Sequence, residues 1–108
     1  MAALTKDITE IVTDRIRHDP ALAVALLDKA LSLFLNGEPD TARLVLRDLV
    51  NATIGFEGLA IATAKSSKSL HRMLSAKGNP TMDSLTVILS VLRRELQVDI
   101  RVQTIACA

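Results

Sequence analysis

The chain has 108 residues, of which 49% are apolar, and its net charge is only +1. This length predicts a single domain over 1–108, and the apolar fraction excludes a disordered chain. The one cysteine, Cys107, excludes an intramolecular disulfide, and the sequence shows neither a bilayer-spanning run nor a signal-peptide pattern, so we expect a cytoplasmic protein.

Residues 1–55 are expected to form three helices that serve as a dimer or partner surface. Thr5 can cap a first helix that ends near His18, and Asp19-Pro20 starts a second that runs to Asn36. This second helix is apolar on nearly every side and must be covered all round. Either it is the central helix of the domain, or one of its faces meets another chain.

The third helix opens at Glu38-Pro39-Asp40, after a left-handed cap at Asn36-Gly37. Its apolar positions predict a core face made of Ala42, Val45, Leu46, Leu49 and Val50. We expect Arg43 and Arg47 to lie one turn apart on the solvent side, where they repel each other by a few tenths of a kcal/mol. An acid such as Asp40 or Asp48, or an outside phosphate, can balance them.

The stretch 56–75 is typical of two short helices joined by a tight turn. We expect it to be the central part of the domain core, which covers residues 56–95. Helical spacing places Leu59, Ala60 and Thr63 on one face of the first helix, and Leu70, Met73 and Leu74 on one face of the second. Ser66 is suited to cap the second helix. With the apolar face turned inward, a small, polar and positive surface points outward: Ser67, Lys68, His71, Arg72 and Ser75.

At these residues the chain resembles the Xre/Cro-type helix-turn-helix family. The resemblance rests on Leu59-Ala60, Ala64-Lys65-Ser66, Leu70 and Leu74-Ser75, and it covers roughly 37–102. The loop Gly78-Asn79-Pro80 and the helix after it resemble one subgroup, the addiction-module antidotes (HigA-like antitoxins). Two residues depart from the family pattern, because it has glycine at position 64 and an apolar residue at position 65. Since alanine adopts positive φ less readily than glycine, we expect a slightly different turn angle.

Positive charge is concentrated in the same stretch. The net charge is −2 over 1–55, +3 over 56–80 and 0 over 81–108. Arg72 can pair with guanine, while Ser67 and Lys68 lie at the helix start that enters a groove most directly. Turn residues on either side are suited to phosphate. The full set of predicted DNA-binding residues is Lys65, Ser66, Ser67, Lys68, His71, Arg72, Lys77 and Asn79.

The last two predicted elements are a helix and a strand. Thr81 caps the sixth helix, and Asp83 lies in its first turn. From 96 to 105 apolar and polar residues alternate, which predicts a β-strand with one buried face. Because a lone strand leaves its backbone groups unpaired, we expect a homodimer in which two copies of the strand form a ribbon.

The predicted fold is therefore all-α, with five to six helices, a central helix-turn-helix of the lambda-repressor type and one C-terminal β-strand that pairs across a dimer. The predicted function is sequence-specific binding of double-stranded DNA. The resemblance implies an antitoxin that represses its own operon and neutralises a toxin partner. The alternative is a protein-interaction module whose helix-turn-helix is only a scaffold. No catalytic set, metal-ligand spacing or cofactor motif is present, so we expect neither an enzyme nor a metal or cofactor.

Overall fold

A computed structural model describes residues 8–108, and the predicted cap Thr5 lies outside them. The described chain is all-helical and contains no strand, which confirms the all-α prediction. Its six helices are α1 (Ile8–Arg17), α2 (Pro20–Leu35), α3 (Pro39–Ala52), α4 (Gly55–Thr63), α5 (Ser67–Met73) and α6 (Met82–Leu96).

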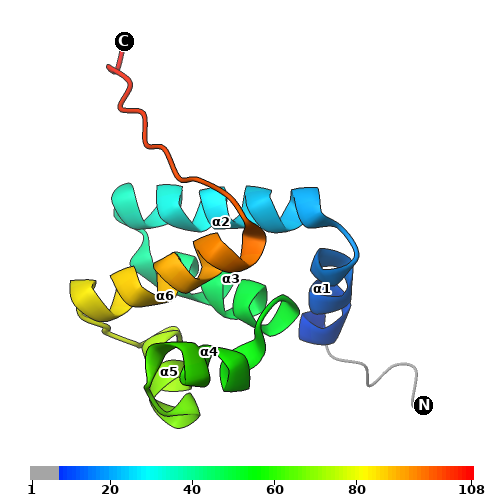
Figure 1. Cartoon of the computed structure of the whole chain (residues 1–108). Coiled ribbons are helices and arrows are strands. Elements are labelled where there is room, and N and C mark those ends of the chain that lie inside the picture. Colours follow the sequence, from blue (N-terminus) through cyan, green and yellow to red (C-terminus); the bar gives the residue numbers. More distant parts are fainter. Residues whose placement is uncertain (1–7) are drawn as a thin grey trace.

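The helices are arranged around α3 (Figure 1). It packs against α1, α2 and α4, while α6 lies over α4 and α2. The α4–α5 pair lies at the end of the molecule away from α2. The second helix is therefore not the central one: it packs chiefly on α3 and keeps an exposed apolar stripe that includes Val24 and Leu35, which are 41% and 67% exposed.

Helix boundaries follow the side-chain caps that the sequence predicts. Asp19 accepts a hydrogen bond from the backbone N–H of Leu22, and Thr81 accepts one from that of Ser84. Gly37 follows the α2 C-cap residue Asn36 and has φ +86°, a left-handed conformation that glycine adopts without steric cost. Each cap satisfies a helix-end group that would otherwise lack a partner.

Apolar side chains from all six described helices meet in one core. Leucines and an isoleucine from four helices have no exposed surface: Leu46, Leu49, Leu59, Leu70, Leu74, Ile88 and Leu92. Their burial contributes roughly 1.5–3 kcal/mol for each side chain. Because Leu59 comes from α4 and Leu70 and Leu74 from α5 and its end, the same core that folds the domain also fixes these two helices.

The predicted C-terminal strand is wrong. Leu96 is the last residue of α6, Gln97 takes a left-handed conformation with φ 54°, and residues 98–108 form an irregular extended tail. Val98 and Ile100 do pack against the core, whereas Val102 of the same alternation is 67% exposed, so the alternation indicates inward side chains only in its first part. The described residues offer no second strand for the tail backbone to join, and the predicted ribbon between subunits loses its basis.

The turn between α4 and α5 depends on Ala64, which adopts the left-handed conformation at φ 56°, ψ 31°. The expectation that alanine would alter the turn angle is not supported by this residue, because it takes the geometry in which glycine is favoured. A left-handed residue with a Cβ costs about 1–2 kcal/mol.

We therefore expect Ala64→Gly to raise the free energy of unfolding by about 0.5–1 kcal/mol, since the relief of strain exceeds the entropy that glycine adds to the unfolded chain. Urea denaturation measures this change. Ala62→Gly, an exposed position inside α4, is the matched control and should destabilise by about 0.5–1 kcal/mol. A loss of stability in Ala64→Gly would contradict the strain at this turn.

Candidate nucleic-acid interface

Helix α5 is a short helix with one buried and one exposed face. Leu70 and, at its C-cap, Leu74 have no exposed surface and hold the helix on the core. Lys68, His71 and Arg72 are exposed on the other side. The predicted orientation of α5 is therefore correct, and no other part of the described chain covers its two exposed cations.

The remaining predicted site residues flank this face. Ser66 is exposed, and its Oγ accepts a hydrogen bond from the Ser69 N–H at 3.0 Å, as a cap of α5. Lys65 and Ser67 are half-buried, so Lys65 lies partly against the protein. Lys77 and Asn79 are exposed in the loop that follows α5. The structure thus groups all eight residues on α5 and its two adjoining loops: Lys65, Ser66, Ser67, Lys68, His71, Arg72, Lys77 and Asn79.

His71 has a structural contact that sequence reasoning missed. Its ring stacks on Phe56 of α4 with the ring centroids 3.8 Å apart and the planes 17° from parallel. Phe56 is buried, and the exposed ring of His71 covers it on the solvent side, between α4 and α5. The spacing of Phe56 and His71 in the sequence gives no sign of this pair, because it depends on the turn angle between the two helices.

Arg43 of α3 is buried, and the prediction that it faces solvent is wrong. Its Nε donates to the Ser75 carbonyl at 3.0 Å, and its Nη2 donates to the Ala76 carbonyl and to Asp40, both at 2.8 Å. These two carbonyls belong to the loop just after α5. One guanidinium thus ties the C-terminal end of α5 to α3. Of the partners that the sequence leaves open for it, Asp40 is the one that pairs with Arg43.

The neighbouring arginine behaves differently. Arg47 is half-buried and lies next to Asp48, whose pKa is raised by burial and lowered to a smaller extent by the Arg47 charge. Sequence periodicity treats Arg43 and Arg47 alike. Only the arrangement of α3 and α5 makes Arg43 the contact between them.

The loop after α5 also approaches it closely at Gly78. A Cβ at this position would meet the Arg72 carbonyl oxygen at 2.6 Å and would also collide with the Met73 carbonyl. The Gly78 N–H donates to the Ser75 carbonyl at 3.0 Å. A residue without a side chain is therefore needed here, and the loop that carries Lys77 and Asn79 is held against α5.

We compared the chain with known proteins: no family model matches it, nor does any curated protein or solved structure. Within residues 8–108, His, Cys, Asp and Glu side chains form no group of three or more that can hold a metal ion. None of the six helices is both long and apolar enough to cross a membrane.

Proposed function

We propose that the α4–α5 pair is a DNA-binding helix-turn-helix and that the protein is a sequence-specific, dimeric transcriptional regulator. The observation that carries this proposal is the exposed face of α5, where Lys68 and Arg72 are open to solvent while Leu70 and Leu74 hold the helix rigidly from behind. A helix of this width fits the major groove of B-DNA.

Each side chain has a role that its position supports. Arg72 contacts a base edge, for which guanine offers two acceptors to one guanidinium. Lys68 and Ser67, in the first turn of α5, and His71 contact base edges or phosphates. The loops on either side of α5 contact the phosphates of the DNA backbone, and such contacts set the position of the protein on the duplex. Their residues in this role are Lys65, Ser66, Lys77 and Asn79. Two copies then read half-sites about 34 Å apart.

The proposed biological role is that of an antitoxin, a cytoplasmic repressor of its own operon that also binds a toxin protein. It rests on the resemblance of roughly residues 37–102, and in particular of the loop Gly78-Asn79-Pro80 and the helix after it, to the antidote family. The alternative, a protein-interaction module that does not bind DNA, is favoured by the low net charge of +1 and by Lys65, which is half-buried where the family has an apolar residue.

Duplex binding separates the two functions. We expect the protein to bind a mixed duplex pool with an affinity that falls steeply with salt. Lys68→Ala should make the slope of log K against log [salt] shallower by about 0.9 if the lysine neutralises one phosphate. Lys29→Ala, at an exposed lysine of α2, is the charge-matched control and should keep the wild-type slope. Equal slopes in the wild type and Lys68→Ala would contradict the proposed role of Lys68.

A further inference from the structure

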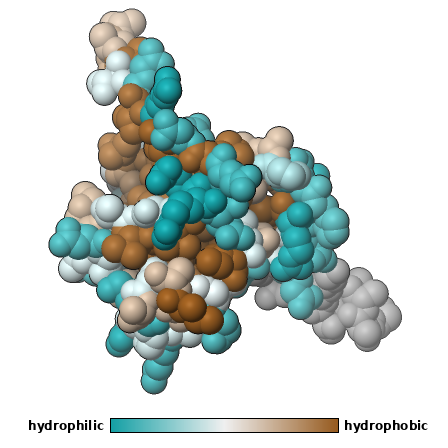
Figure 2. Space-filling model, viewed as in Figure 1, coloured by the Kyte–Doolittle hydropathy of each residue, from teal (hydrophilic) through white to brown (hydrophobic). Residues whose placement is uncertain are grey.

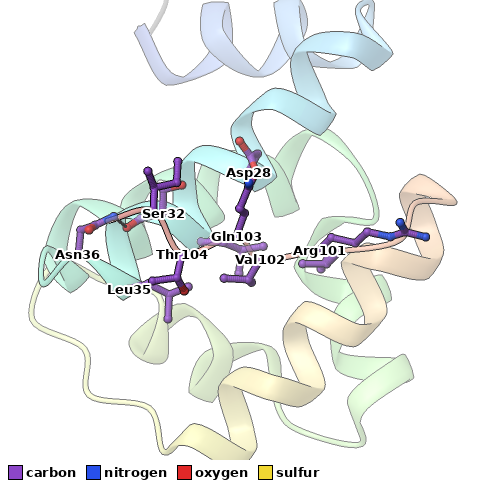
Figure 3. Close-up of a pocket in the computed structure, with 11 residues that line it drawn as sticks. Asp28, Ser32, Leu35, Asn36, Arg101, Val102, Gln103 and Thr104 are labelled. Carbon is purple, nitrogen blue, oxygen red and sulfur yellow. Dashed lines mark hydrogen bonds between the residues drawn. The ribbon is translucent and has the colours of Figure 1, made fainter. Parts of the chain in front are cut away.

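The C-terminal tail runs beside α2, at the end of the molecule away from α5 (Figure 1), and a groove lies between the two. Its volume is about 730 Å³, and a smaller hollow of about 290 Å³ continues it along α2. One wall is a single stripe of α2 that includes Asp28, Ser32, Leu35 and Asn36, and the other is the tail from 100 to 105 (Figure 3).

Apolar side chains on both walls are left in water. Leu35 is 67% exposed, Val102 67% and Ile105 77%. Figure 2 shows apolar residues continuing from the tail onto the body beside it. The tail holds its first residues, Val98 and Ile100, against the core and then projects beyond α2. Contiguous exposed apolar surface of this kind marks an interaction site.

The groove also carries one charge of each sign that is poorly matched within its own chain. Asp28, on the α2 wall, has no hydrogen bond or ion pair in the part of the chain that the structure describes. Arg101, on the tail wall, has only a 3.8 Å contact with Asp99, and both side chains are exposed. A partner that offers a cation to Asp28 and an acid to Arg101 would complement both walls.

We propose that a second copy of this chain occupies the groove, so that each tail docks between the α2 and the tail of its partner. The tail of the second copy has the side chains that suit the groove. It is an extended segment in which Val102 and Ile105 are apolar anchors and Arg101 is the cation for Asp28. A two-fold axis repeats each contact, since the same surface serves both subunits. The proposed contact between the two copies is argued from the groove alone. That the dimer places two α5 helices on DNA rests on the proposed function.

Sedimentation equilibrium of the full chain in the absence of DNA tests the pairing. We expect a mass of twice the 11.7 kDa chain at concentrations on the order of 10 µM. Val102→Asp should raise the dissociation constant at least about 100-fold, because both copies then bury an unpaired charge. Met82→Asp is the matched control: Met82 is 76% exposed at the start of α6, outside the groove, and its variant should pair like the wild type.

Charge reversal identifies the ion pair across the interface. Asp28→Arg and Arg101→Asp should each weaken pairing by about tenfold or more, and the double variant should recover it. A monomeric wild type would overturn the proposal, and so would a dimer that Val102→Asp leaves intact. A double variant as weak as the single ones would overturn the Asp28–Arg101 pairing.

Binding to a single half-site duplex keeps this result separate from the proposed function. A Val102→Asp monomer that still binds a half-site supports both the pairing surface and the DNA interface. A wild-type dimer that binds no duplex leaves the pairing in place and refutes only the DNA function.

Discussion

Replacing Arg43 with methionine is expected to lower the free energy of unfolding by about 2–4 kcal/mol, because the loop after α5 loses a buried, charged hydrogen-bond donor. The variant removes the guanidinium donors of the Ser75 and Ala76 carbonyls, although Ser75 still accepts from the Gly78 N–H, and it keeps most of the apolar stem of the side chain. Hydrogen bonds from a charged donor contribute about 1.5–3 kcal/mol each, and part of this is recovered because the loop carbonyls can reach water. Urea denaturation followed by circular dichroism measures the loss.

Three further variants show which part of the stability loss in Arg43→Met comes from the hydrogen bonds to the loop after α5. Arg47→Met, one turn along α3, changes the same residue type without breaking a contact to the α5 end and should cost less than about 1 kcal/mol. Asp40→Asn should also cost less than about 1 kcal/mol, because the Asp40 side chain is 78% exposed. Arg43→Lys keeps the charge but loses the fork and should fall between Arg43→Met and the wild type. Equal stability of Arg43→Met and Arg47→Met would contradict the proposed stabilising role of the Arg43 hydrogen bonds to the loop after α5.

Arg72→Ala is expected to weaken binding to the preferred duplex by about 1–3 kcal/mol, which is roughly 5-fold to 150-fold, and to relax selectivity at one base pair. Arg72 is exposed on α5, so its removal should leave the fold and the free energy of unfolding nearly unchanged. Fluorescence anisotropy on the selected duplex and on single-base variants of it measures both changes.

Lys68→Ala provides the comparison for Arg72. A phosphate contact weakens binding evenly over all sequences when it is removed, whereas removal of a base contact weakens binding chiefly for the preferred sequence. If Arg72→Ala reduces binding to all duplexes by the same factor, Arg72 is a phosphate contact. If it changes neither affinity nor selectivity, the assignment of Arg72 to the interface is wrong.

Local signals allow the helices and the candidate interface to be predicted from sequence. Caps such as Asp19, Ser66 and Thr81 act within a few residues, so their chemistry is visible in the chain itself. The outward face of α5 follows from the spacing of Leu70 and Leu74, which the core buries completely.

Features that depend on long-range packing are not predictable in this way. Arg43 lies 32 residues from Ser75, and periodicity alone assigns it to the solvent side. The alternation from 96 to 105 identifies inward side chains at Val98 and Ile100, but a strand also needs a neighbour for its backbone, and the described chain provides none. The Phe56–His71 stack likewise depends on the angle between two helices.

Selection of bound duplexes from a random pool with the purified wild-type protein tests the central proposal most directly. We expect enrichment of a palindromic sequence whose half-sites are about one helical turn, or 34 Å, apart, and loss of one enriched base pair in each half-site with Arg72→Ala. A pool that shows no sequence enrichment at low salt, with wild-type protein that is folded, would contradict it.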